Sequence, residues 1–271
     1  MRISKYITTS DGVKLHYLEQ GSGQPLVMLP GWTQSAEQFK YQIEGLKENY
    51  RCLALDWRGH GESQKVTFGY KIQRLCQDLR EWIEVLHLKD VVLMGHSMGA
   101  SVIWCYWDLL KDSRLSKLIL IDEPSVLIKD PIWSQKEVQN YGASFDFETL
   151  LKTCHQLKSP QGDVFTSQLI QSMVTREMSV SMKDWIIKCN LKFSREQAAI
   201  LLFNNCVQDW RDVIPRIKIP TLIVGGRSSV TPWQSQVWIH QQIEGSQLSI
   251  FEEEEGGQHF LFIERASKFN E

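Results

Sequence analysis

The sequence predicts an α/β fold: a doubly wound, mostly parallel sheet with helices on both faces and an inserted helical cap. Two observations carry this prediction. Short apolar runs alternate with helical patterns over residues 1–121, and the same alternation returns after residue 212. The runs are apolar throughout instead of alternating with polar residues, which is typical of parallel strands buried on both faces.

The predicted strands are six apolar runs, at residues 26–29, 52–55, 91–94, 118–121, 220–224 and 248–251. Between them, apolar residues recur every three or four positions. This spacing predicts helices over residues 39–46, 72–86, 100–110 and 233–243.

The predicted domain organisation has three segments. Residues 1–123 and 213–271 form the two parts of one α/β core, and residues 124–212 form the cap between them. The cap segment is rich in Trp, Phe and Met, among them Trp133 and Trp185. Large apolar side chains often line ligand pockets, so we expect Trp133 and Trp185 to contact the substrate.

Composition argues against several classes of partner. The 271 residues include 30 Lys and Arg and 32 Asp and Glu, a formal net charge of −2, so no basic excess favours nucleic-acid binding. No apolar run is long enough to span a membrane, and the N-terminus lacks the apolar core of a signal peptide. The six cysteines are scattered without zinc spacing. We expect a cytoplasmic protein that acts on a small molecule and needs neither a metal nor a cofactor.

Residues 95–99 read GHSMG and match the G-x-S-x-G nucleophile elbow. They directly follow a predicted strand and directly precede a predicted helix, as the elbow requires. A turn this tight holds the serine in a strained backbone conformation, and glycines two positions to either side avoid a clash. Ser97 is therefore the predicted nucleophile, exposed at the carboxyl end of the sheet.

A serine hydroxyl is a weak nucleophile and needs a base. Of the seven histidines, His259 follows the last predicted strand, where the chain order serine, acid, histidine places the base. His96 lies inside the elbow, so its side chain should point away from Ser97. We expect His259 to be the general base.

The acid that orients the base is less obvious. It most often follows the penultimate strand, but here the loop at residues 226–232 contains no Asp or Glu. Asp122 ends the strand before the cap, and from there its carboxylate could reach the N–H of His259 that faces away from Ser97. Glu123 is the alternative, although the side-chain period of two along a strand turns it to the other face.

The oxyanion hole needs backbone N–H groups where negative charge develops. One should come from Met98, the residue after the nucleophile. The other should come from Trp32, because Gly31 allows a sharp turn that aims this N–H inward. The Trp32 indole would then form one wall of the substrate pocket.

Four motifs, taken together and in this order, resemble those of the α/β-hydrolase superfamily: PGW at residues 30–32, DWRGHGES at residues 56–63, the elbow, and GGQHF at residues 256–260. The resemblance covers essentially the whole chain. Residues 29–63 are similar to two groups within it. One comprises small serine esterases, lactonases and non-haem haloperoxidases. The other comprises cofactor-independent dioxygenases that cleave 3-hydroxy-4-quinolones.

The resemblance implies hydrolysis of a small, largely apolar ester or lactone through Ser97, His259 and Asp122, with no cofactor. The alternative is the dioxygenase reaction, in which the histidine and aspartate deprotonate the ring. Residues 33–35 (TQS) and Met98 stand where those dioxygenases carry histidines, which favours a hydrolase. Ser97 argues against haloalkane dehalogenases and epoxide hydrolases, which use an aspartate nucleophile. A non-catalytic ligand-binding receptor is the third reading.

Overall fold

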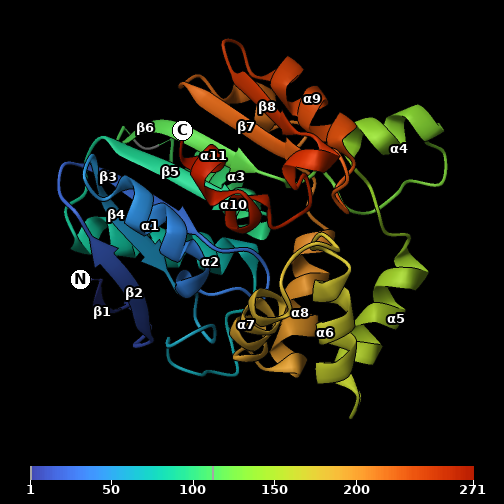
Figure 1. Ribbon diagram of the computed structural model, residues 1–271, viewed down its shortest axis with the longest axis horizontal. Helices are drawn as coiled ribbons and strands as arrows, with labels where there is room; N and C mark the ends of the chain where they lie inside the picture. Colours follow the sequence, from blue (N-terminus) through green and yellow to red (C-terminus); the bar gives the residue numbers. More distant parts are fainter. Residues whose placement is uncertain (1, 112) are drawn as a thin grey trace.

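The computed structural model describes residues 2–111 and 113–271. Within these residues, eight strands form one sheet in the order β1-β2-β4-β3-β5-β6-β7-β8 (Figure 1). The strands are β1 (Ile3–Thr8), β2 (Lys14–Gln20), β3 (Gln24–Leu29), β4 (Tyr50–Leu55), β5 (Val91–His96), β6 (Leu115–Ile121), β7 (Thr221–Gly226) and β8 (Gln247–Phe251). β2 pairs antiparallel with β1 and β4, and the other pairs are parallel. The predicted mostly parallel sheet is confirmed.

Helices cover both faces of the sheet. They are α1 (Lys40–Leu46), α2 (Ile72–Val85), α3 (Met98–Leu110), α9 (Trp233–Gln242), α10 (Leu261–Glu264) and α11 (Ala266–Asn270). Consecutive residues of β3 show the result: Val27 packs into the apolar core that contains Trp82 of α2 and Trp104 of α3. Its neighbour Met28 packs into the other core, with Phe39. Burial on both faces explains why the strands are apolar at every position.

Five α-helices lie between β6 and β7 in the described part of the chain: α4 (Gln135–Tyr141), α5 (Phe147–Lys158), α6 (Gly162–Gln171), α7 (Val180–Leu191) and α8 (Arg195–Cys206). In Figure 1, α5 to α8 gather beyond the carboxyl ends of the parallel strands. All five lie within residues 124–212, the segment predicted to form the cap. That residues 124–212 behave as a separate unit stays a prediction.

Polar residues set where these helices begin. The side chains of Ser134, Asp146 and Ser179 each accept a hydrogen bond from the backbone N–H three residues later, at the starts of α4, α5 and α7. Such caps satisfy N–H groups that have no partner inside the helix. α4 ends at Gly142, whose φ of 78° is left-handed and favours glycine. No helix in the described part of the chain is long and apolar enough to cross a membrane.

Candidate active site

The turn between β5 and α3 holds Ser97 in the strained conformation expected of an elbow, with φ 52° and ψ −131°. A Cβ atom on Gly95 would lie 2.6 Å from the carbonyl carbon of Gly99. A Cβ atom on Gly99 would lie 2.3 Å from the backbone oxygen of Leu29. Both contacts are too close for any side chain, so this turn requires both glycines. The N–H of Ser97 donates to the backbone oxygen of Ile121 at 2.8 Å, which ties the turn to β6.

The loop after β3 passes directly beside the nucleophile. A Cβ atom on Gly31 would lie 2.9 Å from Cβ of Ser97. The Gln34 side chain fixes the turn by accepting the Gly31 N–H at 2.8 Å. Among the described residues, the N–H groups of Trp32 and Met98 have no hydrogen-bond partner, so both are free to receive an oxyanion.

His259 and Asp122 form a direct pair, with 2.7 Å between His259 Nδ1 and Asp122 Oδ2. Both side chains are buried. The aspartate also accepts hydrogen bonds from the Ser229 hydroxyl and, at 3.4 Å, from the N–H of Gly226. A carboxylate accepts hydrogen bonds and cannot donate them. Asp122 therefore holds the His259 imidazole as the tautomer with its proton on Nδ1, and Nε2 faces away from Asp122.

Ser97 and His259 line the same cavity. Among the described residues, however, no hydrogen bond joins their side chains. The Ser97 hydroxyl instead points to Glu123 Oε2 at 3.5 Å, the outer limit of a hydrogen bond. Catalytic hydrogen bonds are often long before substrate binds and shorten in the complex.

Glu123 also reaches the cavity that Ser97 and His259 line, so it lies closer to the candidate site than the strand period predicts. β6 ends at Ile121 and Asp122 has a left-handed φ of 54°, so the strand period no longer applies. Glu123 Oε1 accepts from the Ser101 hydroxyl at 2.7 Å and from the Asn205 amide at 3.2 Å. Burial raises the pKa of this carboxyl to about 7.

Sequence reasoning missed the residues that support these groups, namely Gln34, Ser101, Asn205 and Ser229. Ser229 lies in the loop where an acid was absent, and there it supplies a hydroxyl donor to Asp122. The position of that loop in the sequence was therefore a signal that could have identified Ser229. Asn205 comes from α8, and only the packing of the cap onto the core brings it to Glu123.

His96 points away from Ser97, as expected for its place in the elbow. Its Nε2 donates to the backbone oxygen of His259 at 2.8 Å, so it holds the loop that carries His259. Burial, and then the neighbouring His259, hold the pKa of His96 well below its usual range. His96 therefore positions His259 through a hydrogen bond to the backbone of His259.

The cavity that Ser97 and His259 line, the candidate catalytic cavity, has a volume of about 250 Å³. Beside Ser97, Glu123 and His259 it is lined by Trp32, which supplies the expected wall. Most other lining residues are apolar and come from both core and cap: Pro124, Leu127, Phe145, Phe165, Leu169, Ile170, Met173, Leu202, Val230 and Phe260. A small apolar hollow with a few convergent polar groups is typical of a ligand site.

Trp133 and Trp185 are not among the described residues that line this cavity, which corrects their expected role. Trp133 packs edge-on against Tyr141, and the Arg211 guanidinium lies 4.6 Å from its ring centroid. Trp185 carries the Lys40 ammonium 3.6 Å from its ring centroid. Both rings are engaged in cation–π contacts away from Ser97.

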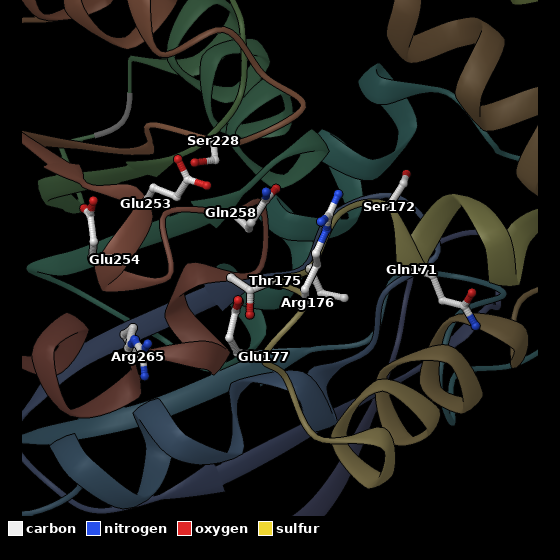
Figure 2. Close-up of a pocket in the computed structure, with 11 residues that line it drawn as sticks. Gln171, Ser172, Thr175, Arg176, Glu177, Ser228, Glu253, Glu254, Gln258 and Arg265 are labelled. Atoms are coloured by element: carbon white, nitrogen blue, oxygen red, sulfur yellow. The ribbon is translucent and has the colours of Figure 1, made fainter.

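A second, larger hollow of about 850 Å³ lies between residues 171–177 and residues 253–265. Figure 2 shows polar and charged side chains projecting into it, among them Arg176 and Glu253. Gln258 lines this polar cleft and the next residue, His259, lines the cavity beside Ser97, so the loop that carries His259 separates the two. The described residues contain no group of three or more His, Cys, Asp or Glu side chains that could hold a metal ion.

Comparison with known proteins identifies the family to which the chain belongs. A family model described as alpha/beta hydrolase fold matches residues 24–266. The AB hydrolase superfamily protein YisY of Bacillus subtilis is 26% identical over 271 residues, which cover 98% of this chain and 96% of YisY.

Two solved structures superpose closely. The esterase EaEST from Exiguobacterium antarcticum has a TM-score of 0.89 at 27% identity, over 99% of this chain and 97% of that one. A bromoperoxidase from Bacillus anthracis has the same TM-score at 24% identity, with the same coverage, which shows the shared fold. The chain therefore belongs to the α/β-hydrolase family of enzymes.

Proposed function

We propose that the protein is a serine hydrolase that cleaves a carboxylic ester or lactone of a small, largely apolar substrate. One observation carries the proposal: His259, paired with Asp122 at 2.7 Å, lines the same largely apolar cavity as a serine in the strained elbow conformation. Serine, base and orienting acid are the groups that acyl transfer needs. The esterase EaEST, similar over nearly the whole chain, agrees with this assignment.

The proposed reaction has two steps. Ser97 attacks the carbonyl carbon while His259 Nε2 takes its proton, and Asp122 stabilises the imidazolium that forms. The N–H groups of Trp32 and Met98 receive the negative oxygen of the tetrahedral intermediate. His259 then protonates the leaving alcohol, which departs and leaves an acyl group on Ser97. Water, deprotonated by His259, releases the acid and restores the serine.

The cavity favours short substrates. A hollow of about 250 Å³ lies just below the usual range of ligand-pocket volumes, and its walls are mostly apolar. We expect esters of short acyl chains to be hydrolysed faster than long-chain esters.

Covalent labelling of Ser97 tests the proposal. A fluorophosphonate should add its mass to Ser97 of the wild type, and Ser97→Ala should lose both this label and turnover of p-nitrophenyl butyrate. Ser22→Ala, a change in an exposed turn, is the matched control and should behave as wild type. Undiminished turnover by Ser97→Ala would remove the serine from the mechanism.

A second candidate is the cofactor-independent dioxygenase reaction. It is favoured by the Ser97 hydroxyl pointing to Glu123 while His259 and Asp122 pair by themselves. In that reaction the dyad deprotonates a hydroxylated ring. Oxygen consumption with a 3-hydroxy-4-quinolone that survives Ser97→Ala would support this candidate against the hydrolase.

A further inference from the structure

Glu123 is a carboxyl group that the hydrolase mechanism does not use, yet it lines the catalytic cavity beside the nucleophile. Its side chain is almost fully buried, and Oε2 lies 3.5 Å from Ser97 Oγ. Buried carboxyl groups are rare unless they are paired with a cation, and no cation contacts this one among the described residues. A buried carboxyl group without a cation beside Ser97 suggests that Glu123 has a function of its own.

The order of the strands places Glu123 relative to a bound substrate. β3 and β6 pair with opposite sides of β5, so Glu123, after β6, lies on the side of Ser97 away from the Gly31–Trp32 turn. In the tetrahedral intermediate, the negative oxygen points to that turn and the leaving oxygen points to His259. The remaining substituent of the attacked carbon is the acyl chain. We therefore expect it to extend toward Glu123.

The hydrogen bonds of Glu123 show where its proton resides. Oε1 already accepts from Ser101 on α3 and from Asn205 on α8, whereas Oε2 has only the long contact with Ser97. In the neutral carboxyl group, the proton therefore sits on Oε2 and faces the cavity. The backbone oxygen of Glu123 accepts from Gln236 on α9, which fixes the residue further.

Asn205 supplies a complementary group. It is 95% buried by the side of Glu123, lines the same cavity, and its Oδ1 atom has no hydrogen-bond partner among the described residues. An unpaired buried acceptor is costly unless a ligand donates to it. Together, the Oε2 hydrogen of Glu123 and Oδ1 of Asn205 offer one donor and one acceptor.

We propose that Glu123 and Asn205 select the substrate: the neutral carboxyl donates a hydrogen bond to a hydroxyl group on the carbon next to the scissile carbonyl, and Asn205 Oδ1 accepts the hydrogen of that hydroxyl. The preferred substrates are then esters or lactones of α-hydroxy acids. This inference rests on the proposed function, in which Ser97 is the nucleophile.

The pairing depends on pH. Burial, and also the neighbouring Asp122 carboxylate, raise the pKa of Glu123, while its hydrogen bonds from Ser101 and Asn205 and the charge of His259 lower it, leaving it at about 7. Cys206 is the other titratable group that faces it from α8, and burial keeps that thiol neutral by raising its pKa. Above neutral pH the ionised carboxylate cannot donate to the substrate. It would also hold the Ser97 hydroxyl proton away from His259.

Two substrates test the selection. Methyl 2-hydroxybutyrate and methyl 2-methylbutyrate differ by a hydroxyl in place of a methyl group, and methanol release gives kcat/KM for each enantiomer at pH 6. Glu123→Leu removes the donor, so the preference for the hydroxy ester should fall roughly fivefold, the value of one net hydrogen bond. Glu123→Gln keeps an N–H donor at the same place and should keep the preference. An unchanged preference in Glu123→Leu would overturn the proposal.

The pH dependence is a second, independent readout. In the wild type, kcat/KM for the hydroxy ester should fall as pH rises through about 7, and Glu123→Gln should abolish this fall. A fall that persists in Glu123→Gln would overturn the proposal even if Glu123→Leu does not fold. Glu264→Gln is the matched control, since burial also raises the pKa of Glu264 but that residue hydrogen-bonds to Thr175 outside the catalytic cavity. Loss of all turnover in Ser97→Ala keeps failure of this inference separate from failure of the proposed function.

Discussion

Replacing Asp122 by asparagine tests the proposed triad most directly, because the two side chains have nearly the same shape. The Asp122 carboxylate accepts three hydrogen bonds, from His259, Ser229 and Gly226. An asparagine has one acceptor oxygen and an NH₂ group that must point at a neighbour. With the NH₂ group toward His259 Nδ1, the imidazole carries its proton on Nε2, the atom that has to accept the Ser97 proton.

The size of the effect follows from this change of tautomer. In a serine protease with a Ser-His-Asp triad, the same substitution lowers kcat by about 10⁴-fold, or roughly 5 kcal/mol of transition-state stabilisation. The substrate does not touch Asp122, so KM should change little. We expect a loss of this order in kcat with p-nitrophenyl butyrate, and near-normal binding.

Steady-state kinetics on the purified variants measure this effect, and circular dichroism checks that Asp122→Asn folds. Glu123→Gln is the informative comparison, because Glu123 is the neighbouring carboxyl and the alternative acid. Glu123→Gln should keep activity near neutral pH. A loss of orders of magnitude in Glu123→Gln, with Asp122→Asn close to wild type, would refute the assignment of the acid.

Three further outcomes are expected. Gly31→Ala should lower kcat by two or more orders of magnitude in ester assays, because its Cβ would lie 2.9 Å from Cβ of Ser97 and displace the oxyanion turn. Glu123→Gln should be more stable than wild type above pH 7 by roughly 3 kcal/mol in urea unfolding, and similar to it below pH 4.5. The reason is that the pKa of the Glu123 carboxyl is raised to about 7 in the folded state. The wild-type protein therefore loses folding stability as pH rises from 4.5 to 7. Trp32→Phe should lower kcat in ester assays, because the indole N–H that donates to Ala198 at 2.8 Å and ties the oxyanion turn to α8 is lost.

The sheet and the elbow were predictable because both are written in local patterns. Uniformly apolar runs indicate strands buried on both faces, and the spacing of Gly95, Ser97 and Gly99 reports a backbone clash that any side chain would cause. The identity of the acid was harder, since the strand rule ends with the strand. Asp122 has a left-handed φ, so the alternation of side chains along β6 does not extend to Asp122 and Glu123.

The cap was not predictable in the same way. Its composition indicates apolar surface, but composition does not say which side chain faces the core and which faces outward. Trp133 and Trp185 satisfy their rings with Arg211 and Lys40, partners that are distant in the chain. The cavity walls come instead from smaller groups such as Leu202. Only tertiary packing decides between them.

The cap and the oxyanion turn are joined, and this links substrate size to chemistry. The Trp32 indole donates to the backbone oxygen of Ala198 in α8, and the Thr33 hydroxyl donates to Asn190 in α7 at 2.7 Å. Thr33 has a left-handed φ of 62°, a conformation that costs energy and persists where its surroundings hold it. Because the cap helices hold this turn, a substrate that displaces them also displaces the N–H of Trp32. A substrate too large for the cavity would therefore lose transition-state stabilisation as well as binding.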